Sequence, residues 1–252
     1  MEQHGPETYG ELNADVYDEW HRIDPTPAVD LLAALIGEGP PGPVLELAVG
    51  TGRVTLPLAA RGVELHGIDA SEAMVARMRA KPGGERIPVT IGDMADVAPD
   101  SGDRFAMVFV VFSTFFFLQT QEEQVRCFAN AARRLVPGGR FVLECPMPDV
   151  ARYDRNQRVE AHQVGLGHVR LTAVRHDPVE QRFEGQHVLI GEQGIRLAPA
   201  FMRYAWPGEL DLMARLAGLE RRDRWGGWRR EPFRAEGMYV TVYEKPAPPP
   251  PS

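Results

Sequence analysis

The sequence predicts an α/β fold, in which a doubly wound and mostly parallel sheet carries an antiparallel β-rich insertion. Three observations support this prediction. Short apolar segments alternate with segments of helical periodicity through residues 44–145. A glycine-containing turn joins the first apolar segment to the helix that follows it. Between residues 146 and 202 the pattern changes to β-rich runs.

The first helix is expected near residue 26. Residues 24–27 read Asp-Pro-Thr-Pro, in which Thr26 is expected to cap the helix and Pro27 suits its first turn. Apolar residues then recur at helical spacing up to Gly37, where the helix is expected to end.

Strands and helices then alternate, which is typical of parallel βαβ units. The expected strands are residues 44–47, 63–68, 88–91, 105–111 and 140–145, and the expected helices are residues 52–61, 71–80 and 121–135. In the insertion, residues 168–176 and 181–190 indicate an antiparallel hairpin with a turn between them. A candidate strand, a helix and a final strand follow at residues 194–206, 207–217 and 238–245.

The turn after the first strand is the most informative local motif. Gly50 and Gly52 follow four residues of buried-strand type, Val44 to Leu47. Glycine permits positive φ angles and lets backbone N–H groups approach a ligand closely, with the positive end of the helix dipole behind them. We therefore expect a ligand-binding loop here.

A second signal lies seventeen residues beyond Gly52, where an apolar strand ends in Asp69. A carboxylate at this place can accept hydrogen bonds from both hydroxyls of a ribose, so the two signals predict a nucleoside-bearing cofactor. The spacing leaves the cofactor open, because the dinucleotide fingerprint G-x-G-x-x-G shares this geometry. Thr55 stands where its third glycine would be.

Glu46, inside the first strand, distinguishes the cofactor classes. A dinucleotide loop has no use for a carboxylate there, whereas a cofactor with a free amino group does. The segment Glu46-x-Ala48-x-Gly50-x-Gly52 resembles the first motif, (D/E)-x-G-x-G-x-G, of the class I methyltransferases that use S-adenosylmethionine. Ala48 replaces the first glycine, and a residue this small is expected still to permit close backbone approach.

Further segments match that family in the family's order. Residues 89–96 resemble the strand and loop beside adenine, and residues 105–118 resemble the fourth strand with the loop that passes the methyl group. Residues 133–144 resemble the helix end, Pro-Gly-Gly turn and fifth strand that follow. The resemblance covers roughly residues 10–150 and 203–244.

The resemblance implies a seven-stranded sheet of the Rossmann-like methyltransferase fold, with the final strand antiparallel between its neighbours. The methyltransferase domain would comprise residues 1–150 and 203–245, of which residues 1–36 form a helical lid. Residues 151–202 would form a β-rich cap over the methyl group or a surface for homodimerisation. The proline-rich residues 246–252 are expected to be a disordered tail.

The resemblance also implies roles for individual residues. Glu46 would orient the cofactor's amino group, Asp69 would bind its ribose and Asp93 would face its adenine. Tyr17, with Tyr9 as a second candidate, would bind the methionine carboxylate. The full set expected around S-adenosylmethionine, or around its product S-adenosylhomocysteine, is Tyr17, Glu46, Ala48, Gly50, Gly52, Arg53, Asp69, Ala70, Asp93, Met94 and Val110.

The acceptor is less well defined. Residues 112–115 read Phe-Ser-Thr-Phe, without the (N/D/S)-P-P-(Y/F) motif of methyltransferases that act on adenine or glutamine amides. The three phenylalanines at 115–117 either line an apolar acceptor pocket or pack in the core. A hydroxyl acceptor would profit from a general base, and His162 and His176 in the insertion are the candidate catalytic residues. An amine acceptor would need no base beyond desolvation.

Composition limits the partners. The formal charge of −7 argues against a nucleic-acid partner, because phosphate binding needs concentrated positive charge. The arginine-rich residues 221–230 are therefore interpreted as a solvated rim. Two cysteines without metal-binding spacing and no clear magnesium-binding carboxylates predict no metal. We expect a cytoplasmic protein without a membrane partner, since the sequence shows neither a secretory signal nor a membrane-length apolar run.

We expect the chain to transfer a methyl group from S-adenosylmethionine to nitrogen or oxygen of a small molecule, such as a natural-product or amino-sugar intermediate. Holding the acceptor in line with the methyl group can lower the activation free energy by ~7 to 11 kcal/mol. Three alternatives stay open: a non-catalytic cofactor-binding protein, a cofactor-assisted reaction without methyl transfer, and a nicotinamide-dependent oxidoreductase.

Overall fold

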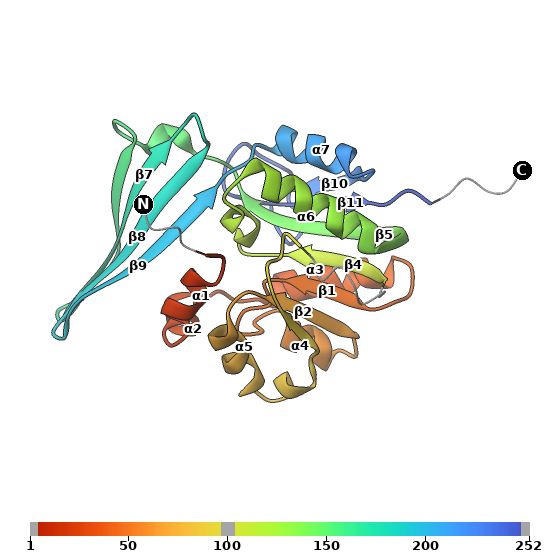
Figure 1. Cartoon of the computed structure of the whole chain (residues 1–252), viewed down its shortest axis with the longest axis horizontal. Coiled ribbons are helices and arrows are strands. Elements are labelled where there is room, and N and C mark those ends of the chain that lie inside the picture. Colours follow the sequence, from red (N-terminus) through yellow and green to blue (C-terminus); the bar gives the residue numbers. More distant parts are fainter. Residues whose placement is uncertain (1–4, 97–103, 248–252) are drawn as a thin grey trace, which may run out of the picture.

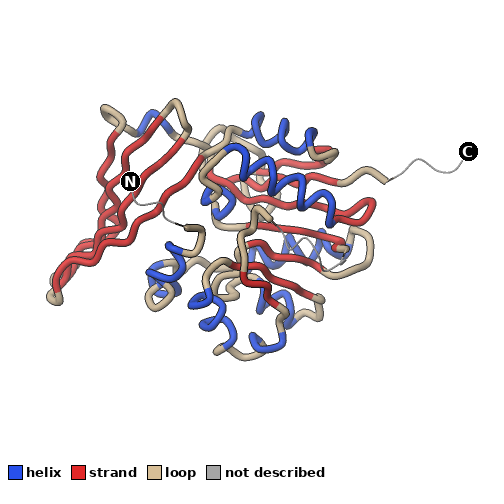
Figure 2. The backbone as a smooth tube through the Cα atoms, viewed as in Figure 1, coloured by secondary structure: helices blue, strands red, loops and turns tan. Residues whose placement is uncertain are grey.

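The protein consists of a large sheet covered by helices on both faces and a smaller sheet that stands apart from it (Figures 1 and 2). The computed structural model describes residues 5–96 and 104–247. Residues 248–252 of the predicted tail lie outside the described residues.

The large sheet contains the strands β1 (Val44–Leu47), β2 (Leu65–Asp69), β3 (Val89–Ile91), β4 (Phe105–Val110), β5 (Leu135–Pro146), β10 (Glu220–Trp225) and β11 (Met238–Glu244). Their order is β10-β11-β5-β4-β1-β2-β3. β11 is antiparallel to both of its neighbours, whereas β5, β4, β1, β2 and β3 run parallel to one another. The predicted seven-stranded, mostly parallel sheet is confirmed.

Helices cover both faces of this sheet, as a doubly wound fold requires. The helices of the described residues are α1 (Thr8–Asn13), α2 (Tyr17–Trp20), α3 (Thr26–Gly37), α4 (Thr55–Ala60), α5 (Glu72–Arg79), α6 (Gln121–Arg134) and α7 (Pro207–Leu216), with short 3-10 helices η1 (Gly84–Arg86), η2 (Thr114–Phe117) and η3 (Val150–Arg152). Phe128 of α6 and Leu210 of α7 join the buried cluster on one face. Leu32 of α3 and Leu58 of α4 join the cluster on the other.

Two helix starts differ from the sequence expectation. Thr26 is the first residue of α3 rather than its cap, and Asp24 Oδ1 instead accepts a hydrogen bond from the Thr26 N–H at 3.0 Å. The helix α4 begins at Thr55 and not at residue 52, because the chain still turns with positive φ at Gly50 and Gly52.

The insertion forms the smaller sheet, whose neighbouring strands are all antiparallel. Its strands are β6 (Gln157–Val164), β7 (His168–Asp177), β8 (Arg182–Gly191) and β9 (Gly194–Arg203). The predicted hairpin is β7 and β8, and Asp177 Oδ1 fixes its turn by accepting hydrogen bonds from the N–H groups of Val179 and Glu180. The sequence did not predict β6, because this largely exposed edge strand is rich in polar residues.

α1 and α2 lie between the smaller sheet and the large domain (Figure 1), where α1 contacts β9 on one side and α5 on the other. Glu11 of α1 accepts a hydrogen bond from Ser71 Oγ at 2.8 Å, beside the start of α5. On the other side, Arg196 of β9 pairs with Asp15 at 2.8 Å. A Cβ atom at Gly10 would lie 2.5 Å from the Ser71 Cβ, so α1 approaches α5 at a distance that only glycine allows.

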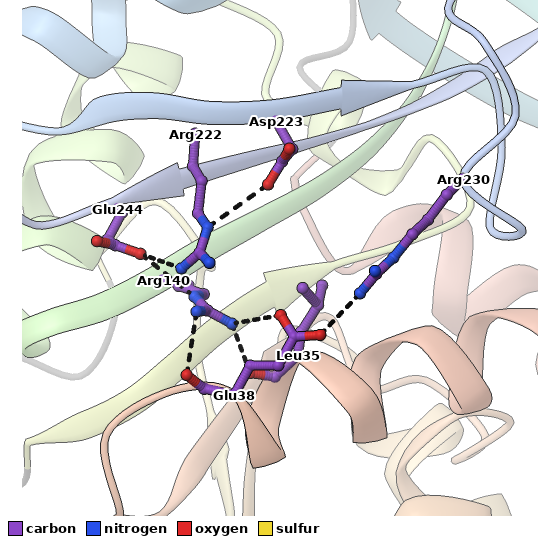
Figure 3. Close-up of polar contacts among 7 residues, drawn as sticks. All are labelled: Leu35, Glu38, Arg140, Arg222, Asp223, Arg230 and Glu244. Carbon is purple, nitrogen blue, oxygen red and sulfur yellow. Dashed lines mark hydrogen bonds and ion pairs between the residues drawn. The ribbon is translucent and has the colours of Figure 1, made fainter.

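A buried arginine joins α3 to the antiparallel end of the large sheet (Figure 3). Arg140 of β5 is 2% exposed, and its guanidinium donates to the Leu35 carbonyl at 2.6 Å and to the Glu38 carbonyl at 3.3 Å. These donors satisfy carbonyls at the end of α3 that have no partner within the helix. The surrounding ion-pair network contains Glu38, Arg222, Asp223, Arg230 and Glu244. Arginines of the 221–230 segment thus pair with carboxylates.

Candidate active site

A pocket of about 180 Å³ opens where β1 and β2 end, beneath α1 and beside η2. In open α/β sheets this is the edge at which ligands bind. Several residues that the sequence predicted for cofactor binding line it: Tyr17, Ala48, Gly50, Asp69, Ala70, Asp93 and Met94. The structure thus brings these predicted residues together from four separate segments of the chain.

The loop between β1 and α4 forms the floor of the pocket. Gly50 has a φ of 55°, and the nearest atom that a Cβ there would meet is the Ala48 carbonyl oxygen at 4.0 Å. Gly52 has a φ of 78° and does not line the pocket, because a Cβ there would lie 2.5 Å from the Met78 Cγ. Ala48 adopts a left-handed φ of 57°, the conformation for which the family motif uses glycine. The loop therefore holds Ala48 in a conformation that favours glycine.

Glu46 lies beneath this loop and is 2% exposed. Its carboxylate accepts a hydrogen bond from the Thr55 hydroxyl, at the first turn of α4. Burial raises the pKa of Glu46 to about 8, with the nearby Asp69 charge contributing in the same direction and the Thr55 hydrogen bond opposing it. A positive group placed in the pocket would therefore favour ionisation of this carboxyl.

Asp69 ends β2 and organises the loop across from it. Its Oδ2 accepts a hydrogen bond from the Gly50 N–H at 2.6 Å, and its Oδ1 accepts one from the Ser71 N–H at 2.8 Å. Burial raises the pKa of Asp69, and these two backbone donors oppose that shift. Each carboxylate oxygen keeps a further acceptor site, so the pair can still bind two ligand hydroxyls.

Arg53 is half-buried and does not line the pocket, but its Nη1 and Nη2 atoms are buried and have no hydrogen-bond partner among the described residues. Its guanidinium lies over the Tyr17 ring at 5.2 Å and over the Phe112 ring at 4.8 Å. Leaving buried donors unsatisfied costs free energy, and a ligand carboxylate would satisfy both. Glu46 does not line the pocket either, so the structure places this acidic and this basic side chain beside the loop that forms the pocket floor. By charge alone, the two residues complement the ammonium and carboxylate ends of an amino acid moiety.

The other end of the pocket is formed by the loop after β3. Asp93 lines the pocket, and its Oδ1 accepts a hydrogen bond from the Ala95 N–H at 2.8 Å. Met94 is 8% exposed and lines the pocket beside it. Val110 does not line the pocket, because its side chain is fully buried in the core at the end of β4.

The two predicted catalytic histidines do not line the pocket. His162 lies on the exposed strand β6 and shares a hydrogen bond of 2.7 Å with the Thr172 hydroxyl. His176 is 6% exposed, and its Nε2 lies 3.0 Å from the Tyr204 hydroxyl within an aromatic cluster that includes Phe183. A catalytic role for either residue stays a prediction that this geometry does not support.

Tyr9 is the pocket residue with the most informative chemistry. Its hydroxyl lies 3.0 Å from Nε2 of His21. Burial, followed by the Arg53 charge, lowers the pKa of His21 to about 4, so His21 is neutral at pH 7. In the tautomer protonated on Nδ1, His21 accepts the Tyr9 hydrogen, and the Tyr9 oxygen is then free to accept a hydrogen bond from a ligand.

Aromatic side chains line the pocket near Tyr9. Phe117 of η2 packs against the Tyr9 ring at 5.1 Å, and Phe201 of β9 lines the pocket as well. Phe115 and Phe116 instead pack in the core, so the run of three phenylalanines divides between the two predicted fates. Sequence reasoning missed His21 and Phe201, because no local motif marks residues that meet only through the tertiary fold.

Among the described residues, no three His, Cys, Asp or Glu side chains gather into a metal-binding group. None of the helices in residues 5–96 and 104–247 has the length and hydropathy that a membrane span requires.

Comparison with known proteins agrees with this geometry. Residues 44–139 match the family described as a methyltransferase domain. The CcbJ methyltransferase from Streptomyces caelestis is 39% identical, with a TM-score of 0.89, over 97% of this chain and 100% of that one. Cypemycin N-terminal methyltransferase from a Streptomyces species is 28% identical over 94% of this chain and 97% of its own.

A third comparison concerns the cofactor. The structure of S-adenosylmethionine-bound CalS10, an amino pentose methyltransferase from Micromonospora echinaspora, has a TM-score of 0.67 at 23% identity, over 96% of this chain and 100% of that one. At this identity the likeness shows a shared fold, and S-adenosylmethionine is the ligand bound in that structure. The chain therefore belongs to the class I S-adenosylmethionine-dependent methyltransferases.

Proposed function

We propose that this methyltransferase acts on the nitrogen of a small-molecule amine, such as an amino sugar or another natural-product intermediate. When bound, S-adenosylmethionine supplies a methyl group on a positively charged sulfur, which the amine displaces to leave S-adenosylhomocysteine. Two of the similar proteins support an amine acceptor, since one is named for the N-terminus of cypemycin and the other for an amino pentose.

Within this proposal the predicted residues hold the cofactor along its length. Arg53 and Tyr17 bind the methionine carboxylate, and Glu46 faces the methionine amino group. The side chain of Asp69 accepts the ribose hydroxyls, and Asp93 with Met94 borders the adenine. The unpartnered guanidinium of Arg53 supports this orientation most directly, because the carboxylate is the only anionic group of the cofactor.

The affinity for S-adenosylhomocysteine is expected to rise with pH up to about 8, because the protonated Glu46 must ionise before it can pair with the ligand's ammonium group. The dissociation constant should fall by up to about tenfold per pH unit between about pH 6 and pH 8. The Glu46→Gln variant should lack this slope. Calorimetric titration across this range measures it, and an unchanged slope in the variant would rule out Glu46 as its source.

The stability of the ligand-free protein should change with pH in the opposite sense. Glu46 has a pKa of about 8 when folded, above the ordinary value of 4.5. Its contribution to stability is thus fully present below pH 4.5 and declines as pH rises towards 8. Urea unfolding of the wild type across this pH range measures the decline in stability. The Glu46→Gln variant, which has no carboxyl group to ionise, is the control and should lack this decline.

On the acceptor side, the neutral Tyr9–His21 pair suits an amine. The Tyr9 oxygen can accept a hydrogen bond from an N–H of the acceptor, which orients the nitrogen lone pair and needs no strong base. The neighbouring Phe117 and Phe201 exclude water and favour the uncharged amine over its ammonium form. This Tyr9–His21 hydrogen bond is the observation that carries the choice of nitrogen.

The test is a panel of amino sugars and small peptides with free amino termini, each matched by the analogue that bears a hydroxyl in place of the amine. Mass spectrometry should find the added methyl group on nitrogen and none on the matched alcohols. For an accepted amine, Tyr9→Phe should lower kcat/KM by about tenfold to a hundredfold, since it removes the hydroxyl. Methylation of the alcohols alone would contradict the proposal.

We also propose that the smaller sheet forms a homodimer through its outer face. Register places two apolar rows on this face: Ala161, Leu171, Val188 and Leu197, and beside them Val164, Val169, Ile190 and Ile195. Ile195 is 69% exposed and Leu197 is 58% exposed. Strand spacings give a face of about 600 Å² per copy and about 1,200 Å² in a dimer, which is within the range of specific interfaces.

A Leu197→Glu variant should therefore be a monomer, because a dimer would bury the introduced charge. The matched control is Leu216→Glu on α7, where the leucine is 78% exposed but lies on the large domain. Size-exclusion chromatography with light scattering should give a dimer for the wild type and for Leu216→Glu. A monomeric wild type would overturn the proposed interface.

A further inference from the structure

The turn that follows β4 has an unusual backbone. Phe112 and Ser113 both adopt left-handed conformations, with φ angles of 56° and 65°, although neither is glycine. Side chains in this region crowd the neighbouring carbonyl, so two such residues in succession persist only where the surrounding structure holds them.

A buried carboxylate holds this turn. Glu144 of β5 is 5% exposed, and its Oε2 accepts a hydrogen bond from the Phe112 N–H at 2.6 Å. Its Oε1 accepts a second hydrogen bond from Nε1 of Trp228, also at 2.6 Å. Burial raises the pKa of Glu144, and both donors oppose that shift. Trp228 thus gives the arginine-rich segment a contact inside the domain as well as at its rim.

The turn lies between Arg53 and a wall of the pocket. The ring of Phe112 lies 4.8 Å from the Arg53 guanidinium and is one of the two aromatic rings that pack against it. Directly after the turn, Thr114 and Phe117 of η2 line the pocket. A change in the direction of the Phe112 backbone would therefore move the support of Arg53 and the wall beside η2 together.

We propose that Glu144 is a positioning residue for methyl transfer, because it holds the left-handed Phe112–Ser113 turn and so keeps Arg53 in place for the methionine carboxylate. This inference rests on the proposed orientation of the cofactor. Glu144 contacts neither the cofactor nor the acceptor in this arrangement, and it acts through the Phe112 N–H.

The primary test compares two ligands in the Glu144→Leu variant, which removes the acceptor of the Phe112 N–H. S-adenosylhomocysteine carries the carboxylate that Arg53 binds, whereas 5′-methylthioadenosine shares its adenosine but has no amino acid moiety. Calorimetry should find affinity for S-adenosylhomocysteine lowered by about tenfold to thirtyfold. Affinity for 5′-methylthioadenosine should stay within about twofold of wild type, since the adenosine contacts are untouched.

A glycine in the turn should reverse this loss. Glycine adopts a left-handed φ without steric cost, so Ser113→Gly in the Glu144→Leu background should recover at least about threefold in affinity for S-adenosylhomocysteine. Trp228→Phe is the matched control. It removes the other hydrogen bond of Glu144 but leaves the Phe112 contact, and its affinity should stay within about threefold of wild type.

Two results would overturn the inference. An equal loss of affinity for both ligands would show that Glu144 acts only on general stability. Wild-type affinity for S-adenosylhomocysteine in Glu144→Leu would show that the turn does not depend on it. Failure of the cofactor orientation itself would appear separately, as an Arg53→Met variant that binds both ligands normally.

Discussion

Replacing Asp69 with alanine is expected to lower the affinity for S-adenosylhomocysteine by at least about a hundredfold. The variant loses two charge-assisted hydrogen bonds to the ribose hydroxyls. It also loses the hydrogen bond to the Gly50 N–H at 2.6 Å, which fixes the loop on the pocket floor. Calorimetric titration with S-adenosylhomocysteine measures the change, and urea unfolding shows how much of it reflects lost stability.

Asp30→Ala is a suitable control for the Asp69 variant. Asp30 pairs with Arg61 on the exposed surface of α3, and its side chain is 59% exposed. Exposed pairs of this kind contribute little to stability, so Asp30→Ala should bind as wild type does. If Asp69→Ala also bound as wild type does, the ribose assignment would be wrong.

The second large effect is expected for Arg53→Met. The variant removes the positive charge that faces the methionine carboxylate, so affinity for S-adenosylhomocysteine should fall by about thirtyfold or more. Affinity for 5′-methylthioadenosine should stay within about threefold of wild type, because that ligand has no carboxylate. Calorimetry with the two ligands measures the difference.

The free energy of unfolding of Arg53→Met should distinguish a role of Arg53 in cofactor binding from a role in holding the fold. Nη1 and Nη2 of Arg53 have no hydrogen-bond partner among the described residues, and the cation rests only on two aromatic rings. The free energy of unfolding of ligand-free Arg53→Met should therefore stay within about 1 kcal/mol of wild type. A large loss of stability with unchanged ligand affinity would assign Arg53 to the fold and not to the cofactor.

The sequence predicted the parts of the site that are local. Gly50 follows its strand directly, and Asp69 ends the neighbouring strand, so strand patterns and turn chemistry were sufficient to place both. The alternation of strands and helices predicted the parallel sheet, and the family resemblance implied the antiparallel position of β11. For Gly50 and Asp69, the expected role follows from the place of the residue after or at the end of a strand.

The acceptor side could not be predicted in this way. Tyr9, Phe117 and Phe201 come from an N-terminal helix, a 3-10 helix and the smaller sheet, and only the tertiary fold brings them to one pocket. The histidines of the insertion were plausible bases by residue type, but His176 is held by Tyr204 in an aromatic cluster instead. Glu144 was overlooked because it lies within an apolar strand and its partner Phe112 is 32 residues away.

A crystal structure with bound S-adenosylhomocysteine tests the central claim most directly. We expect its carboxylate within hydrogen-bond distance of the Arg53 guanidinium, its amino group towards Glu46 and its ribose hydroxyls on Asp69. A ligand bound with its amino acid moiety away from Arg53, or bound outside the pocket between α1 and η2, would contradict this account.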